Sequence, residues 1–130
     1  MTPVYEYCES RSRFLFYLKA DLGNVAQFHC WLKEIKGLNP KARHVLYVFR
    51  IGNQEGCSEN GEPVKAAHKQ LAILSREGAS GLGLVAVRYY GGKKLGAANL
   101  EHVFLAGFKM AVDIGKELAD GRRQWDKEDR

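Results

Sequence analysis

The chain has 130 residues, of which 45% are hydrophobic and 27% charged, and its formal net charge is +5. That length and composition exclude a disordered or collagen-like chain and predict one globular domain that folds without metal or disulfide support. No apolar run approaches the roughly 18 residues of a membrane span, and the first residues lack a secretory signal pattern, so we expect a cytoplasmic protein with no membrane partner.

The first half of the chain alternates between strand and helix patterns. Residues 4–8 and 13–20 have strand composition and are predicted to pair as a hairpin. Asn24 is predicted to cap a helix whose apolar residues recur at helical spacing. Residues 42–50 are rich in β-branched and aromatic residues and predict another strand, which a polar loop over residues 51–62 follows.

The second half continues the same alternation. Pro63 suits the first turn of a second helix, and the apolar run 84–87 is typical of a central strand covered on both faces. A long amphipathic pattern then predicts a helix over residues 95–118. We therefore expect one α+β domain over residues 1–118, with the order β-β-α-β-α-β-α and helices packed on one sheet, and a polar tail over residues 119–130.

Positive charge is concentrated in one part of the sequence. Between Pro63 and Gly96 six Lys or Arg residues stand against one Glu, and the rest of the chain sums to zero. The six cations are Lys65, Lys69, Arg76, Arg88, Lys93 and Lys94. This asymmetry predicts an anionic partner, although a set of solvated lysines gives the same pattern.

A double glycine follows the predicted central strand. Gly91 and Gly92 let the backbone approach a ligand closely, and a following helix N-terminus would favour an anion there. Lys93 and Lys94 would oppose the dipole of that helix unless a negative group normally sits beside them. The alternative is a tight turn with both lysines in water. The segment matches neither the Walker A pattern nor the dinucleotide fingerprint.

A second turn carries two carboxylates just before a predicted helix. It consists of Glu59, Asn60, Gly61, Glu62 and Pro63. The carboxylates either stabilise the turn, with Glu62 favouring the helix dipole, or act as a cation site or an acid–base pair. No third ligand is identifiable nearby, so we predict no metal site, no cofactor and no catalytic residue.

Three cysteines, Cys8, Cys30 and Cys57, have no paired spacing and predict neither a disulfide framework nor a zinc ribbon. Cys57 would form a nucleophilic dyad if folding brought His44 or His68 beside it. Isolated cysteines and histidines are more typical of core and surface positions, so no nucleophile is assigned.

Two of these segments together resemble the YigZ/Impact family, also called UPF0029. The resemblance rests on the segments SENGEP at residues 58–63 and VAVRYYGGKKLG at residues 85–96. It covers roughly residues 4–118. Ser12, Arg13 and Phe14 and the Ala42, Arg43 and His44 run also look like family positions. The matching motif positions are Gly61, Glu62, Arg88, Gly91, Gly92, Lys94 and Gly96.

The resemblance implies the ribosomal protein S5 domain 2-like fold, with a four-stranded sheet backed by helices. It also implies that further domains known in bacterial and eukaryotic members are absent from this chain. Eukaryotic members restrain a starvation-activated translation kinase, which implies a role in translation or its regulation. This sequence departs from the family pattern at Glu59, Asn60 and residues 64–67, and Lys65 and Lys93 make it more basic.

Three functions follow as hypotheses. The first is a non-catalytic binding module whose basic segment meets RNA, the ribosome or a translation-regulatory protein. The second is a small-ligand-binding protein or enzyme with a pocket between the Glu62 loop and the turn at Gly91 and Gly92. The third is a structural partner protein with an exposed aromatic patch at Trp31 or Trp125. The sequence leaves the oligomeric state open.

Overall fold

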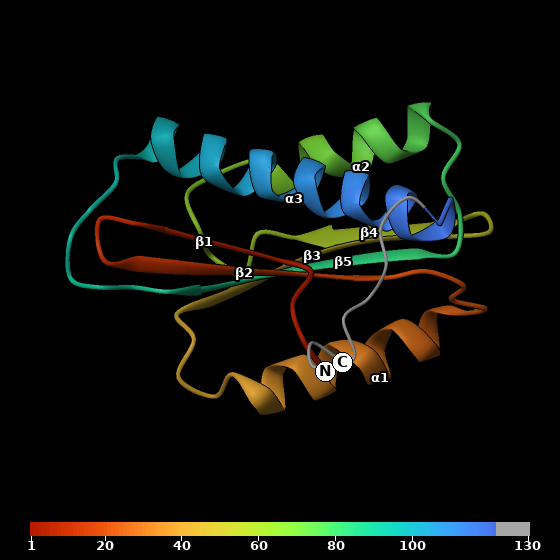
Figure 1. The fold of residues 1–130 in the computed structure, drawn as a ribbon, viewed down its shortest axis with the longest axis horizontal. Coiled ribbons are helices and arrows are strands. Elements are labelled where there is room, and N and C mark those ends of the chain that lie inside the picture. The colour runs from red at the N-terminus through yellow and green to blue at the C-terminus, as the bar shows by residue number, and fades with distance from the viewer. Residues whose placement is uncertain (122–130) are drawn as a thin grey trace.

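The computed structural model describes residues 1–121, which form one five-stranded sheet and three helices (Figure 1). The elements are β1 (Tyr5–Glu9), β2 (Ser12–Lys19), α1 (Val25–Leu38), β3 (His44–Ile51), β4 (Gln54–Ser58), α2 (Ala66–Arg76), β5 (Leu82–Tyr89) and α3 (Ala97–Ala119). The predicted α+β class and the predicted order are confirmed, apart from the additional strand β4. Over the described range, no helix is both long and apolar enough to cross a membrane.

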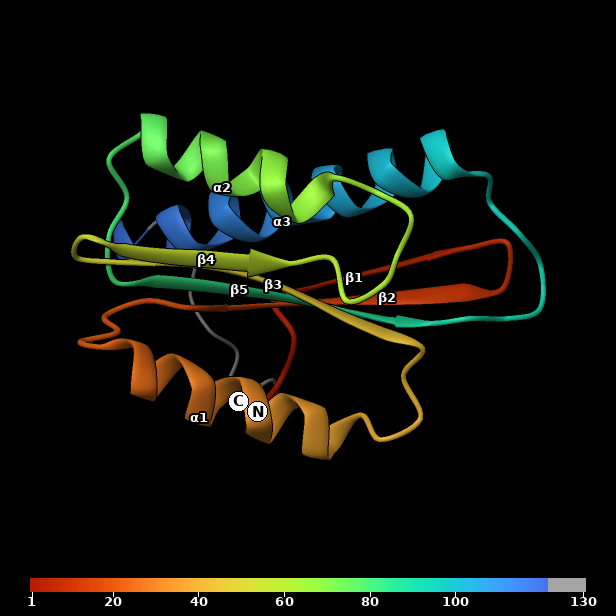
Figure 2. The ribbon, with the colours of Figure 1, turned by 180° about the vertical axis from the view of Figure 1, so that it is seen from behind.

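The sheet is antiparallel throughout, with the strand order β1-β2-β5-β3-β4. Helix α1 covers one face, and α2 and α3 lie side by side on the other (Figures 1 and 2). Strand β5 is central, and its residues 83–88 are all buried, as the continuous apolar run predicts.

Strand β4 lies within the segment predicted as a polar loop, so the expected count of four strands is wrong. It pairs with the end of β3, with Ile51 opposite Gln54 and Tyr47 opposite Ser58. The strand is short, polar and at the sheet edge, so it carries none of the alternation that identifies a half-buried strand. Gly56 fits there because the Phe49 ring occupies the space that a Cβ would need.

The helix starts differ from the prediction in two of three cases. Asn24 caps α1 as predicted, since its Oδ1 accepts the Gln27 N–H at 2.9 Å. Helix α2 begins at Ala66 rather than at Pro63, and α3 begins at Ala97 rather than at residue 95. The later start of α3 follows from Gly96, whose φ of +82° lies outside the helical region.

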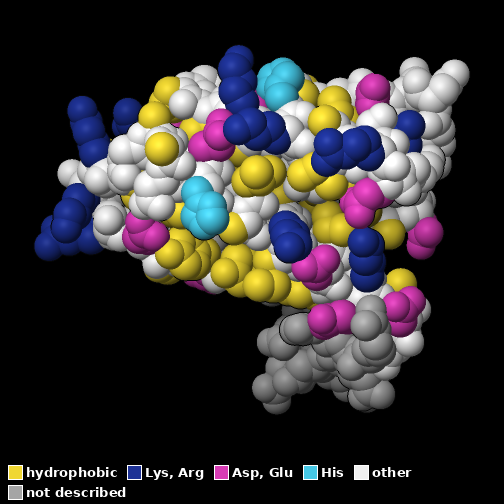
Figure 3. Space-filling view, turned by 90° about the horizontal axis from the view of Figure 1, so that it is seen from above, with side chains coloured by type: hydrophobic (Ala, Val, Ile, Leu, Met, Phe, Trp, Pro, Cys, Tyr) yellow, Lys and Arg dark blue, Asp and Glu magenta, His cyan; other side chains and the backbone are white. Residues whose placement is uncertain are grey.

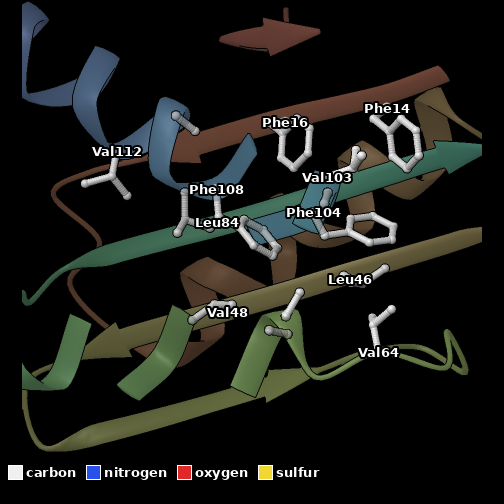
Figure 4. Close-up of a cluster of buried hydrophobic side chains, with 14 of the residues drawn as sticks. Phe14, Phe16, Leu46, Val48, Val64, Leu84, Val103, Phe104, Phe108 and Val112 are labelled. Carbon is white, nitrogen blue, oxygen red and sulfur yellow. The ribbon is translucent and has the colours of Figure 1, made fainter. Parts of the chain in front are cut away.

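Two apolar layers sandwich the sheet. Toward α2 and α3, Phe14 packs edge to face on Phe104 and Phe16 on Phe108, at centroid distances of 5.3 and 5.7 Å (Figure 4). Toward α1, the second layer buries Trp31, which is only 6% exposed, so the predicted exposed patch is wrong there. Trp125 lies outside the described residues.

Candidate functional site

A cavity of about 470 Å³ lies at the end of the molecule where α3 begins. Three parts of the chain form its walls: the start of β3, the loop before α2, and the end of β5 with the segment leading to α3. The lining residues are Arg43, His44, Gly61, Glu62, Pro63, Arg88, Tyr90, Lys94, Leu95, Gly96, Ala97 and Leu100. Figure 3, which views the molecule from above Figure 1, shows Lys and Arg side chains gathered at the end where α3 begins.

Strand pairing brings the start of β3 and the end of β5 together. His44 lies opposite Arg88 in the β3–β5 ladder, and the Arg43 N–H donates to the Arg88 carbonyl oxygen at 2.8 Å. Because side chains alternate along a strand, Arg88 shares the face of Leu84 and Ala86, which is the face that α2 and α3 cover. The sheet therefore directs Arg88 toward α3 at the end of its apolar layer.

Arg88 is held by a buried carboxylate. Its Nη1 donates to both oxygens of Glu62 at 3.0 Å, and the two residues are 5% and 6% exposed. His44 Nε2 lies 3.3 Å from Glu62 Oε1, while His44 Nδ1 donates to the Asn60 carbonyl oxygen. Glu62 is thus paired with the Arg88 guanidinium, and the His44 ring lies beside it at the cavity wall.

The other acidic residue of the loop serves the helix. Glu59 accepts the backbone N–H groups of Ala67 and His68, each at 3.0 Å, which satisfies two donors at the start of α2. The role that the sequence suggests for Glu62 at this helix therefore belongs to Glu59. Asn60, with a φ of +52°, ties the loop to β3 because its Oδ1 accepts the Val45 N–H.

Positive charge exceeds negative charge in the cavity lining. Arg43, Arg88 and Lys94 stand against Glu62 alone, so three cations minus one carboxylate leave a surplus of two charges, with His44 counted as neutral. The guanidinium carbons of Arg43 and Arg88 lie 4.8 and 5.4 Å from the centroid of the Tyr90 ring. Within the described chain, Arg88 Nε has no hydrogen-bond partner.

The start of α3 adds backbone donors to this lining. Gly96 is the N-cap and offers no side-chain acceptor, and no acidic residue occupies the first turn. The first N–H groups of a helix have no partner within the helix, and the helix dipole places positive potential there. Gly96 and Ala97 line the cavity, so the arrangement suits an anion.

The glycine turn has a different place from the predicted one. Gly91 and Gly92 do not open a helix, because residues 90–96 form an irregular segment before α3. A Cβ at Gly91 would overlap the backbone of Arg11, and Gly92 has a φ of +86°, so both positions require glycine for the path of the chain. Gly91, Gly92 and Lys93 are not among the lining residues of the cavity.

The remaining predicted site residues divide between the cavity and its surroundings. Lys94 and Gly96 line the cavity, whereas Lys65 does not, and the Lys65 backbone N–H donates to Glu101 of α3. Arg43 and Tyr90 are cavity residues that the sequence places within family-like segments, residues 42–44 and 85–96, but does not assign to a site. The signal for Arg43 is its place directly before a strand that pairs with the strand of Arg88.

Cys57 does not have the surroundings of an activated nucleophile. Burial raises the pKa of the Cys57 thiol, and the nearby carboxylates of Glu59 and Glu55 raise it further. His44 and His68, the two candidate bases, are hydrogen-bonded to Asn60 and to Glu59. A reactive cysteine needs a lowered pKa, so this environment opposes nucleophilic catalysis. Across residues 1–121, no three His, Cys, Asp or Glu side chains form a potential metal cluster.

These features define a class of protein: an α+β domain with a five-stranded antiparallel sheet and a cation-rich cavity at the start of its last helix. A family model described as the Impact N-terminal domain matches residues 10–111. The chain belongs to this Impact family, so the resemblance that the two motifs carry is confirmed.

The relatives of the chain include longer curated bacterial proteins. An IMPACT family member of Haemophilus influenzae is 33% identical over 117 residues, which are 85% of this chain and 56% of that protein. The IMPACT family member YigZ of Escherichia coli is 32% identical over 108 residues, with 78% and 52% covered. The chain thus spans about half the length of the curated relatives it matches.

Two solved structures share the fold. A crystal structure described as that of a hypothetical protein has a TM-score of 0.76 and 28% identity, over 86% of this chain and 59% of that one. The structure of Yih1, described as a two-domain translational regulator, has a TM-score of 0.52 and 19% identity, over 85% and 45%. At that identity the second likeness shows the fold alone.

Proposed function

We propose that this chain is a non-catalytic, cytoplasmic binding module in translation or its regulation, and that it meets RNA through the end of the molecule where α3 begins. The observation that carries the proposal is the surplus of cations in the cavity lining, whose single carboxylate is already engaged by Arg88. Such a surplus attracts a polyanion at long range and holds a phosphate at short range.

The link to translation is supported by kinship. The chain belongs to the Impact family, and a protein described as a translational regulator has the same fold. The single domain over residues 1–118 and its likeness to ribosomal protein S5 domain 2 remain part of this proposal. The alternative form of the proposal is that the partner is a ribosomal or translation-regulatory protein.

The test is the affinity for a mixed RNA measured over a series of salt concentrations. We expect the affinity to fall steeply with salt, and the slope of log K against log salt to fall by about one for each phosphate group that a variant no longer binds. Lys94→Ala should show such a change and Lys93→Ala should weaken binding similarly, because Lys94 lines the cavity, Lys93 precedes it in the chain, and both are exposed. Lys19→Ala is the control, since the β2–β5 register places Lys19 at the opposite end of the sheet from Arg88.

Absence of RNA binding at low salt would refute the RNA form of the proposal. Capture of a ribosomal or translation-regulatory protein by the wild-type chain but not by Lys94→Ala would then support the protein form.

A second candidate function is small-ligand binding, which the volume of the cavity favours because ligand pockets commonly measure about 300–1,000 Å³. The wall opposite the Glu62 loop is formed by residues 94–97 rather than by Gly91 and Gly92. A ligand that binds equally well to wild type and Lys94→Ala would argue against this cavity as its site.

A further inference from the structure

We infer that the cavity takes a phosphomonoester, meaning the terminal phosphate of an RNA strand or nucleotide, in preference to the phosphodiester of an internal linkage. The inference rests on the proposed function, because it specifies which phosphate of an RNA the module selects. Three features carry it: the charge balance of the lining, the arrangement of its donors, and the ring of Tyr90.

The charge balance separates the two kinds of phosphate. Three cations minus one carboxylate leave two positive charges in the lining, and the start of α3 adds about half a charge. A phosphomonoester carries about −1.5 to −2 at pH 7, whereas an internal diester carries about −1. The monoester therefore leaves about half to one positive charge uncompensated, and the diester leaves about one and a half.

The donors suit three terminal oxygens. Glu62 uses only Nη1 of Arg88, so it does not occupy the edge of the guanidinium that carries Nε, and Nε is buried without a partner in the described residues. That edge of a guanidinium matches two phosphate oxygens at once. Lys94 and the first N–H groups of α3 are further donors in the same lining, so an oxygen beyond those two also finds a partner.

Arg88 is also ready for the ligand before it arrives. Its side chain is nearly buried and fixed by Glu62, with its guanidinium carbon 5.8 Å from the centroid of the Phe14 ring. A donor that is already oriented loses little freedom on binding, which favours affinity.

The ring of Tyr90 favours a nucleotide over a phosphopeptide as the carrier of the phosphate. Tyr90 lines the cavity and is 37% exposed, so it offers an aromatic surface beside the cations. A nucleobase stacks on such a surface whatever its identity. The cavity, at about 470 Å³, lies within the size range of small-ligand sites.

The experiment compares ligands that differ only in the terminal phosphate. The full 130-residue chain is titrated with a short fluorescent oligouridylate carrying either a 5′-phosphate or a 5′-hydroxyl, at one salt concentration. We expect the 5′-phosphorylated strand to bind about tenfold more tightly. Uridine 5′-monophosphate and inorganic phosphate are added as competitors: displacement by the mononucleotide identifies a free nucleotide as a sufficient ligand, and its failure assigns the site to RNA ends.

Two adjacent lysines provide the matched pair of variants. Lys94→Ala should abolish the preference for the phosphorylated strand, because Lys94 lines the cavity. Lys93→Ala should lower the affinity for both strands and keep their ratio, because Lys93 is exposed outside the lining. Both side chains are exposed, so neither variant removes part of the core. Arg43→Gln should act like Lys94→Ala.

The outcomes separate this inference from the proposed function. If both strands bind equally and with a steep salt dependence, the module binds RNA and the monoester inference is wrong. If neither strand binds but the mononucleotide binds wild type and fails to bind Lys94→Ala, the monoester site stands and the RNA proposal fails. Tighter binding of a phosphoserine peptide than of the phosphorylated strand would overturn the assignment to nucleotides.

Discussion

Glu62 and Arg88 carry opposite charges at positions that solvent barely reaches, and each is the other's closest charged partner. Replacing Glu62 with Gln leaves the guanidinium buried without a compensating charge. Breaking a buried ion pair in this way costs about 3–5 kcal/mol. We expect a loss of that size in the free energy of unfolding of Glu62→Gln, measured by urea denaturation.

Glu55→Gln provides the control for this prediction. Glu55 pairs with Arg50 at 3.5 Å, but its side chain is 48% exposed, and a surface pair contributes about 0–1 kcal/mol. A loss for Glu62→Gln no larger than that of Glu55→Gln would show that the buried pair does not stabilise the fold.

The same pair shows what sequence reasoning reaches at the residue scale. Glu62 and Arg88 are both identified as motif positions, yet their contact is not, because 26 residues separate them and only the β3–β5 pairing and the loop path bring them together. Local spacing predicts that Glu62 stabilises the start of α2. The carboxylate that fills it, Glu59, lies three residues earlier, because the turn at Asn60 and Gly61 reverses the chain between them.

At the scale of elements, the contact between α3 and β2 depends on a glycine. A Cβ at Gly107 would overlap the Phe16 ring, which is fully buried against Phe108. We expect Gly107→Ala to destabilise the protein by about 1–3 kcal/mol, the usual cost of overpacking a core.

Gly37→Ala is the matched control, since a Cβ at this α1 position meets nothing within 4 Å. It should stabilise the protein by about 0.5–1 kcal/mol through the better helix propensity of alanine. Urea denaturation of both variants measures the change in the free energy of unfolding, which should be a loss for Gly107→Ala and a gain for Gly37→Ala. Two changes in the same direction would contradict the packing argument.

The junction between α2 and α3 predicts a dependence on pH. Glu101 of α3 accepts a hydrogen bond from Lys69 Nζ at 2.6 Å and another from the Lys65 N–H at 2.7 Å. These bonds, the one from Lys69 first, lower the pKa of the Glu101 carboxyl below its ordinary value. A group with a lowered folded-state pKa stabilises the fold above its unfolded pKa and loses that contribution as the pH falls through the folded value.

Glu101→Gln should therefore be less stable than wild type at pH 7, with the difference shrinking as the pH falls below the ordinary glutamate range. Unfolding curves of both proteins between about pH 3 and pH 7 measure it. A difference that stays constant over this range would mean that the charge of Glu101 contributes nothing.

Elements are predictable from sequence where their periodicity reports burial. The apolar run of β5 and the stripe of α3 face packed neighbours, so their patterns carry the information. Strand β4 is exposed and polar, and only its pairing with β3 makes it a strand. The start of α3 depends on the backbone conformation of Gly96, which the identity of the residue permits but does not determine.

For the whole molecule, the uneven distribution of charge becomes a local surplus in the folded state. Sequence counting places the excess between residues 63 and 96, yet the fold draws only Arg88 and Lys94 of those cations into the cavity and adds Arg43 from outside that range. The sequence therefore predicts the positive charge of the site and some of its residues. The assembly of the site depends on the pairing of β3 with β5, which brings Arg43 beside Arg88.

This surplus couples the stability of the whole fold to anions. The cations of the cavity are close together only in the native state, so an anion that binds there stabilises the native state by mass action, by about 2.7 kcal/mol at one hundred times its dissociation constant. We expect phosphate to raise the melting temperature of the wild-type chain above its value in chloride at equal ionic strength.

Phosphate also stabilises proteins generally by exclusion from their surface, and that part of the stabilisation should be common to all variants. Lys94→Ala should retain only the common part, whereas Lys19→Ala, at the other end of the sheet, should respond as wild type does. An equal response of all three proteins would mean that the cavity holds no anion, because the general effect alone would then account for the stabilisation.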